Sequence, residues 1–147
     1  MTIQIVLLPV FVQVALTFAL LFWMASVRTG SVSRGETKIR DIALGQPAWP
    51  EQPTKVSNCY HSQFQIPLLF YVLVILAWIT KQADLLFVVM AWVFVILRLA
   101  HAYIHTTSNH VPTRFKVFAA GMFVLLLVGS LALRIGSRKV PVEDGKR

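Results

Sequence analysis

Four stretches of this chain carry almost no charge over lengths close to twenty residues, and this property restricts its fold more than any other. A helix needs about 20 apolar residues to cross the hydrocarbon core of a bilayer, where every backbone polar group must be bonded within the segment. Hydrophobic residues make up 56% of the 147 residues and charged residues only 14%, whereas about a quarter of a soluble domain is charged. We therefore predict an all-α integral membrane four-helix bundle, a single domain of residues 1–147, with spans at about 3–27, 58–80, 85–106 and 113–133 and a polar tail at 134–147.

The connections between the predicted spans differ in length and composition. Residues 81–84 suit a tight turn, whereas residues 28–56 form a long polar connection with several glycines and prolines. We expect that connection to be a loop with a short helix around 36–44. Four spans place both ends of the bundle's chain on one side of the membrane, and the long loop on the other side together with residues 107–112. Lysines and arginines divide almost evenly between the two sides, so the positive-inside rule does not fix the orientation.

Two of the predicted spans carry stripes of polar side chains that meet the same membrane face. Offsets of three, seven and eleven residues return to nearly the same side of an α-helix. Polar and ionisable side chains at membrane depth are costly, so they often mark a functional site. The stripes are Asn58, His61 and Gln65 at the start of the second span, and Arg98, His101, His105 and Asn109 at the end of the third.

Arginines make this membrane face strongly positive. Arg28 ends the first predicted span, and Arg114 opens the fourth two residues after Pro112, where a helix N-terminus adds further positive potential. Arg98 lies one to two turns inside its span with no carboxylate nearby on the helix, so it needs an anion, a cavity or a route to the surface. An anionic ligand with carboxylates or a thiolate would satisfy these charges, and the phosphate of a lipid is the alternative.

Other interpretations of the polar residues follow from the same sequence. The amides and imidazoles can bond to one another between helices without any ligand, as is common in membrane bundles. His101 and His105 are spaced to share a metal ion, but no third firm ligand completes a shell, so we expect neither a metal nor a haem site. The single cysteine, Cys59, excludes an intramolecular disulfide. The net charge of +8 suits phospholipid headgroups here, and we expect no nucleic-acid partner.

The residues of the second stripe resemble the third-helix signature of the MAPEG family, the membrane-associated proteins in eicosanoid and glutathione metabolism. The similar features are Arg98, a His three residues later, a ring residue at +7, Pro112 at +14 and Arg114 at +16. Residues 58–71, with a proline and aromatic residues after the polar stripe, resemble the second-helix motif of the family. Four spans, a long first loop and a tight second turn also match, up to Arg134. The likeness is to the small bacterial branch.

The resemblance implies a homotrimer of a bacterial inner membrane, with active sites between neighbouring subunits and glutathione bound in a U-shape by helix ends. It implies that Arg114 stabilises the glutathione thiolate, and that Arg98 and His101 hold the tripeptide. His105 stands where several members have a tyrosine. Gln65, or alternatively Gln63, stands where members usually carry an acidic residue that pairs with the glutathione amine. Together with the polar stripes and the end of the first span, the resemblance gives a candidate site with Arg114 as the catalytic residue and with these residues binding glutathione: Arg28, Asn58, His61, Gln65, Arg98, His101, His105 and Asn109.

Thiol chemistry agrees with this assignment. A thiol with a pKa of about 8.5 must lose its proton to attack, and a nearby cation or helix N-terminus lowers that pKa. Arg114 supplies both. We therefore expect a glutathione-binding membrane protein that acts as a glutathione transferase or peroxidase, with membrane lipids and a lipophilic small molecule as partners. The alternative is a non-catalytic trimeric membrane scaffold or lipid-binding protein.

Overall fold

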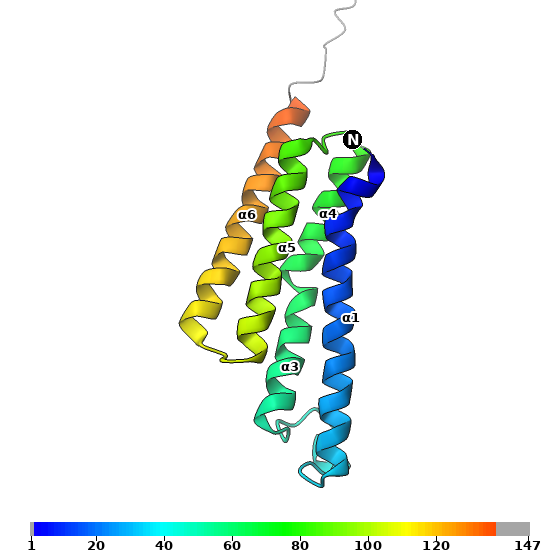
Figure 1. Ribbon diagram of the computed structural model, residues 1–147, viewed down its shortest axis with the longest axis vertical. Coiled ribbons are helices and arrows are strands. Elements are labelled where there is room, and N and C mark those ends of the chain that lie inside the picture. Colours follow the sequence, from blue (N-terminus) through cyan, green and yellow to red (C-terminus); the bar gives the residue numbers. More distant parts are fainter. Residues whose placement is uncertain (1, 138–147) are drawn as a thin grey trace, which may run out of the picture.

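The computed structural model describes residues 2–137 of the chain, and the surroundings of side chains as far as residue 130. Within that part, four long helical rods lie side by side along one axis (Figure 1). Each is long and apolar enough to cross a bilayer, so the chain is an all-α, multi-pass integral membrane protein, as the sequence predicts. The rods are α1 (Ile3–Ser33), the broken pair α3 (Glu51–His61) and α4 (Ile66–Ile79), α5 (Leu85–Thr106) and α6 (Val111–Ser137).

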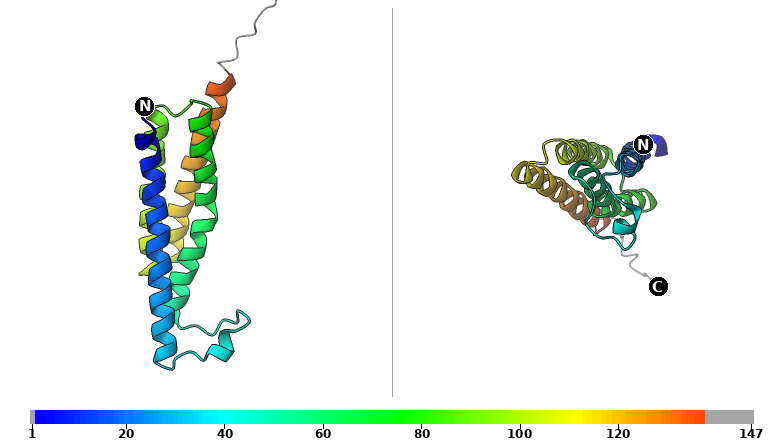
Figure 2. Two further views of the ribbon diagram at one scale, coloured as in Figure 1. Left: turned by 90° about the vertical axis from the view of Figure 1, so that its right-hand side faces the viewer. Right: turned by 90° about the horizontal axis from the view of Figure 1, so that it is seen from below.

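The rods form a bundle in which α5 packs against each of the other three rods. α5 packs against α6, α1 and α3, and α4 packs against α1 and α6, so α1 and α6 lie at opposite sides (Figures 1 and 2). The start of α1 and the end of α6 share one end of the bundle, and the connections after α1 and α5 share the other end, as four spans require. At that second end, α1 and α3 extend beyond the α5–α6 hairpin (Figure 1).

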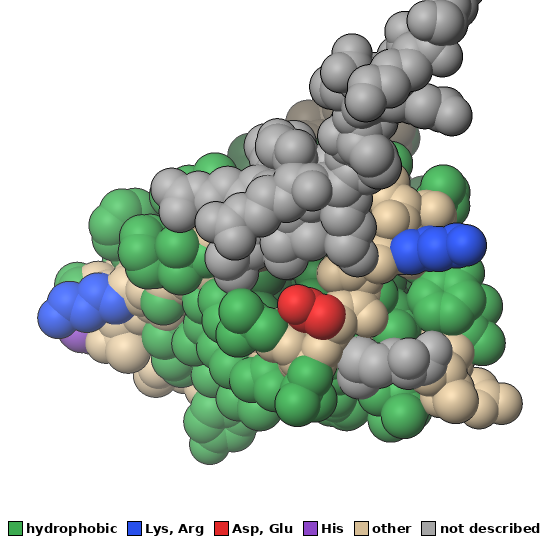
Figure 3. All heavy atoms as spheres, turned by 90° about the horizontal axis from the view of Figure 1, so that it is seen from above, with side chains coloured by type: hydrophobic (Ala, Val, Ile, Leu, Met, Phe, Trp, Pro, Cys, Tyr) green, Lys and Arg blue, Asp and Glu red, His purple; other side chains and the backbone are tan. Residues whose placement is uncertain are grey.

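Apolar packing is concentrated in the half of the bundle that carries the N-terminus. The rings of Phe70 on α4 and Phe94 on α5 stack at the centre of this cluster, with centroids 4.6 Å apart. Viewed from that end, the described surface is mainly hydrophobic with isolated charged side chains (Figure 3). Buried polar side chains gather instead in the other half, toward the long connection.

α1 ends six residues later than the sequence predicts, so Arg28 lies within the helix rather than at its end. The stop comes at Gly35, whose φ of 74° is a left-handed conformation that glycine adopts without strain. The N–H groups of Gly35 and Glu36 donate to the carbonyl oxygens of residues 32 and 31, each at 3.0 Å. This pair of bonds is the Schellman ending of a helix, and it satisfies carbonyl groups that the helix leaves free.

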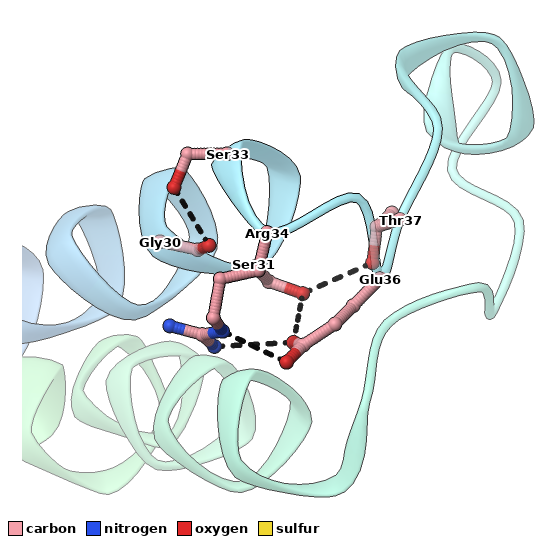
Figure 4. A network of polar contacts seen from close by, with 6 residues as sticks. All are labelled: Gly30, Ser31, Ser33, Arg34, Glu36 and Thr37. Carbon is pink, nitrogen blue, oxygen red and sulfur yellow. Dashed lines mark hydrogen bonds and ion pairs between the residues drawn. The ribbon is translucent and has the colours of Figure 1, made fainter.

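A small network of polar contacts fixes the start of the long connection (Figure 4). Arg34 holds the Glu36 carboxylate with two hydrogen bonds, Nε to Oε1 at 2.8 Å and Nη2 to Oε2 at 3.1 Å. The Ser31 hydroxyl donates to the same carboxylate at 3.0 Å and lies 3.1 Å from the Thr37 hydroxyl. The hydrogen bonds from Arg34, and secondarily from Ser31, lower the pKa of Glu36 below its ordinary value. Farther along, α2 (Ile39–Ile42) confirms the predicted short helix.

The second span is not the continuous helix that was predicted for 58–80. α3 begins at Glu51, because Pro50 and an acidic residue in the first turn suit a helix start. The 3₁₀ turn η1 (Ser62–Phe64) separates α3 from α4. Pro67 accounts for the break, since it lacks an N–H and its ring would clash with the carbonyl of residue 63 in a continuous helix. The backbone of Gln65 leaves the helical region, with φ −96° and ψ −104°.

The third and fourth spans lie close to their predicted positions. α5 occupies residues 85–106, and Asp84 caps its start by accepting a hydrogen bond from the N–H of Phe87 at 2.8 Å. α6 begins two residues earlier than predicted, at Val111, with Pro112 in its first turn. The predicted polar tail at 134–147 is helical as far as residue 137, and residues 138–147 lie outside the described part of the chain.

Candidate functional site

A cavity of about 290 Å³ opens between α3, η1, α5 and the first turns of α6, near the α5–α6 connection. It brings together five of the nine residues that the sequence predicts for the site. Its walls combine these polar side chains with an additional serine and apolar residues of α6. The lining consists of Asn58, Ser62, Gln65, His101, His105, Val111, Arg114, Phe115 and Phe118.

The two histidines of α5 form one wall of the cavity. His101 and His105 lie one turn apart, with ring centroids 5.5 Å apart in an edge-on arrangement, and His101 also contacts Phe118 of α6 at 6.0 Å. Their exposed fractions are only 4% and 7%. Among the described residues, the Nδ1 atom of each ring has no hydrogen-bond partner. Buried polar atoms without partners are costly, so both rings are suited to bind a ligand or ordered water.

Arg114 stands in the first turn of α6 and also lines the cavity. Its Nη1 atom donates a hydrogen bond to the side-chain oxygen of Asn109 at 2.6 Å. Asn109 has a φ of 49°, the left-handed conformation that asparagine tolerates better than most residues, and its N–H donates to the carbonyl oxygen of Ile104 at 2.8 Å. Asn109 is not among the lining residues, but it bonds to the last turn of α5 and holds the guanidinium of Arg114.

Arg98 lies behind the cavity rather than in its wall. Only 2% of its surface is exposed, and its Nη2 atom donates to the carbonyl oxygen of Ser62 at 3.2 Å and to the Ser62 hydroxyl at 3.1 Å. Because the second span is broken here, the Ser62 carbonyl has no α-helical partner and accepts from the backbone only a long hydrogen bond, from the N–H of Gln65 at 3.4 Å. A cation near a helix C-terminus is also favoured by the helix dipole. The sequence argument that Arg98 needs an anion, a cavity or a route to the surface thus missed a further possibility, a backbone carbonyl at the break of the second span. The Nε and Nη1 atoms of Arg98 remain without partners among the described residues.

The structure separates the two glutamines that the sequence left as alternatives. Gln65 is exposed and lines the cavity, whereas Gln63 is buried and directed to α1. The Nε2 atom of Gln13 donates to Oε1 of Gln63 at 2.9 Å, and Nε2 of Gln63 donates to the carbonyl oxygen of Cys59 at 2.9 Å. Gln13 was not predicted as part of any site. The sequence feature that could have revealed Gln13 is its position as an amide in the middle of an otherwise apolar span.

Arg28 and His61 are not among the residues that line the cavity. The Nη2 atom of Arg28 donates to the Ser57 hydroxyl at 2.7 Å, and its guanidinium lies 4.7 Å from the centre of the Trp49 ring, a cation–π distance. Arg28 therefore joins α1 to α3 and to the long connection. His61 is exposed, and its ring contacts that of Tyr60 with centroids 5.6 Å apart.

Comparison with known protein families gives a match that extends over most of the chain and is not limited to the residues of the cavity. The family model described as the MAPEG family matches residues 6–134, a segment that contains the cavity and extends from the first turns of α1 into the last turns of α6. No curated protein and no solved structure was found to match. The match covers most of the chain, including all the residues that line the cavity. The chain belongs to the MAPEG family of membrane proteins, which is associated with glutathione and eicosanoid metabolism.

Proposed function

We propose that the cavity between α3, α5 and α6 binds glutathione as a cosubstrate, and that the protein transfers it to lipophilic electrophiles or uses it to reduce lipophilic peroxides. One observation carries the proposal: a guanidinium at a helix N-terminus lines the same cavity as two buried imidazoles, whose Nδ1 atoms have no hydrogen-bond partner among the described residues. This arrangement suits an anion with several hydrogen-bonding groups. Family membership names glutathione as the anion to test first.

Arg114 is the residue that activates the thiol in this proposal. Its positive charge and the N-terminus of α6 both stabilise a thiolate over a thiol, so the pKa of bound glutathione falls and more of it is ionised at neutral pH. The thiolate sulfur then attacks the electrophile, an S–C bond forms and the leaving group departs with the bonding electrons. The hydrogen bond from Arg114 to Asn109 fixes the guanidinium before the ligand arrives.

The lipophilic substrate enters from the bilayer. Val111 and Phe115 line the cavity and are themselves exposed, with 58% and 67% of their surface accessible on the outside of α6. Apolar side chains therefore connect the cavity with the surface that contacts lipid. An electrophile dissolved in the membrane can approach the thiolate along them without crossing water.

We further propose that the protein is a homotrimer of a bacterial inner membrane, in which a neighbouring subunit completes each site. Support comes from family membership and from residues that the single chain leaves accessible. Asn58 and Gln65 are exposed at the cavity, and His61 is exposed at the end of α3. A neighbouring subunit can cover these side chains together with the bound tripeptide.

Thermal unfolding of the detergent-solubilised protein with and without glutathione tests the proposal. A ligand at a hundred times its dissociation constant stabilises the folded state by about 2.7 kcal/mol. We expect such a shift in the wild type and a smaller one in Arg114→Gln. An absent shift in the wild type would favour the scaffold or lipid-binding alternative, and a shift without turnover of any lipophilic electrophile would leave binding as the function.

A further inference from the structure

A continuous series of hydrogen bonds crosses the bundle from α1 to α5 through the break in the second span. The Nε2 atom of Gln13 on α1 donates to Oε1 of Gln63 at 2.9 Å, and Nε2 of Gln63 donates to the Ser62 hydroxyl at 3.3 Å. Nη2 of Arg98 on α5 donates to the same hydroxyl at 3.1 Å. These four residues, which we call the Gln13–Arg98 network, join α1, η1 and α5.

The Gln13–Arg98 network is buried within a single chain. The exposed fraction of each of its four residues is between 0% and 9%. A neighbouring subunit therefore neither forms these contacts nor replaces them. Because water compensates poorly for a hydrogen bond that is lost at a buried position, such a network favours one arrangement of its members over others.

The cavity wall at η1 depends on this network. Ser62 and Gln65 line the cavity, whereas Gln63, which lies between them in the sequence, is directed to α1. The backbone of Gln65 is not helical, and its N–H donates only a long hydrogen bond, at 3.4 Å, to the carbonyl oxygen of Ser62. Fewer regular helical hydrogen bonds therefore hold this segment than hold the helices on both sides of it. Side chains add the missing support, with Arg98 on the α5 side and the amides of Gln13 and Gln63 on the α1 side.

Building on the proposed function, we propose that Gln13 and Gln63 are positioning residues of the candidate site. Neither is among the residues that line the cavity, but they hold η1 so that Ser62 and Gln65 stand at its wall. Gln63 is also tied to α3, because its Nε2 atom donates to the carbonyl oxygen of Cys59 at 2.9 Å. Gln13 holds the other end of the same amide. Without Gln13, the Oε1 atom of Gln63 loses its donor and the amide no longer favours one position of η1.

Cysteine labelling of the full chain in detergent tests the position of η1 without any ligand. Gln65→Cys places a thiol in the cavity wall, and the native Cys59 is fully buried, so its background reaction with a small, water-soluble methanethiosulfonate should be slow. Adding Gln13→Leu should change the labelling rate at position 65 by about three- to tenfold, the effect of one lost hydrogen bond on the preferred position of η1. An unchanged rate would overturn the inference.

A second labelled position separates a local displacement of η1 from a general loosening of the fold. Gln52→Cys is the matched control, because Gln52 is an exposed residue of α3 outside the cavity lining. Gln13→Leu should leave the labelling rate at position 52 unchanged. Equal changes of rate at positions 52 and 65 would also overturn the inference, since they would show that Gln13 only stabilises the bundle.

Calorimetry with glutathione tests the consequence for the site. Gln13→Leu should weaken glutathione binding by about three- to tenfold, because Ser62 and Gln65 lose their fixed positions. Replacing both amides, in Gln13→Leu/Gln63→Leu, leaves neither of the pair without its partner, so the thermal stability should recover toward that of the wild type while binding remains weak. A double variant that binds like the wild type would assign the pair to stability alone and overturn the inference.

The two experiments distinguish the positioning role from the proposed function. If the wild type binds no glutathione but Gln13→Leu changes labelling at position 65 alone, the proposed function fails and the role of the amide pair in placing the cavity wall stands. If the wild type binds glutathione and neither binding nor labelling responds to Gln13→Leu, the proposed function stands and the positioning role fails.

Discussion

The guanidinium of Arg98 donates to both the carbonyl oxygen and the hydroxyl of Ser62, at 3.2 and 3.1 Å. Arg98, a buried side chain of α5, thus bonds to Ser62, the residue that directly follows the end of α3. Ser62 is also part of the cavity wall. The contact therefore couples the break in the helix, which Pro67 requires, to the shape of the candidate site.

Replacing Arg98 tests whether this contact supports the fold. Arg98→Met keeps much of the volume but leaves the Ser62 carbonyl without its charged donor, which should lower the free energy of unfolding by about 1–3 kcal/mol. Ser62→Ala removes only the hydroxyl, and should cost less because the carbonyl bond persists. Chemical unfolding in detergent micelles measures both variants. A larger loss in Ser62→Ala than in Arg98→Met would show that the carbonyl contact is unimportant.

Arg114→Gln tests thiolate stabilisation. Glutamine retains hydrogen bonding but removes the charge, so the pKa of the bound glutathione thiol should rise, with each unit corresponding to about 1.4 kcal/mol of lost preference for the thiolate. Thiolate absorbance in the ultraviolet, followed against pH with glutathione bound, measures this change. Arg114→Lys should recover part of the effect, since it restores charge without the planar geometry of arginine. An unchanged thiol pKa in a variant that still binds would limit Arg114 to holding an anion.

Asn109→Gly isolates the residue that holds Arg114. Glycine retains the left-handed backbone at φ 49° while removing the hydrogen bond to Arg114. Glutathione affinity should fall by about three- to tenfold, as expected for one lost hydrogen bond. Asn109→Ala should in addition lower the thermal stability, because alanine disfavours this backbone conformation. If Asn109→Gly binds like the wild type, Arg114 does not depend on this contact.

His101→Ala and His105→Ala separate ligand binding from interhelical packing. If the rings bond to glutathione through the cavity, each substitution should weaken binding by about three- to tenfold. Binding is measured by calorimetry and stability by thermal unfolding without ligand. Equal losses of stability with unaltered binding in both variants would assign the histidines to contacts between helices.

The Glu36 network predicts how the long connection responds to acid. Because Arg34 lowers the pKa of Glu36 in the folded state, its contribution to stability is present above the ordinary carboxyl pKa and is lost as the pH falls through the lowered value. Limited proteolysis of residues 34–50 should therefore become faster as the pH is lowered below about 4. Glu36→Gln should be cleaved readily at neutral pH, with less dependence on acid. Similar cleavage of wild type and variant at neutral pH would show that the network does not hold this segment.

The sequence predicted the features that depend on regular periodicity. Four apolar segments determined the number of spans and the end of the bundle at which the polar stripes meet. Of the stripe predicted for the third span, His101 and His105 line the cavity together, because α5 is unbroken and a spacing of four residues returns to the same face; Arg98 lies behind the cavity, and Asn109 lies beyond the end of α5. His101 and His105 accordingly lie side by side at the cavity.

The features that were missed depend on departures from that periodicity. The break at η1 changes the direction of successive side chains, so that Gln63 contacts α1 and Gln65, two residues later, lines the cavity. Arg98 bonds to a backbone carbonyl, and the side-chain types in a sequence do not reveal which carbonyl groups are available as partners. The extension of α1 past Arg28 depends on a turn at Gly35, which was assigned to the loop because of its composition.

The unequal lengths of the helices relate the cavity to the thickness of the surrounding lipid. α1 has 31 residues and α5 has 22, which at about 1.5 Å per residue gives rods of about 46 and 33 Å. Only the shorter rod matches a hydrocarbon layer of about 30 Å, so the hairpin beside the cavity ends near the headgroups while α1 and α3 continue past it. Lipids with longer acyl chains would draw the cavity mouth into hydrocarbon, and shorter chains would raise it into water. For the proposed reaction, the composition of the bilayer would thereby set how readily a water-soluble thiol and an oil-soluble acceptor can meet.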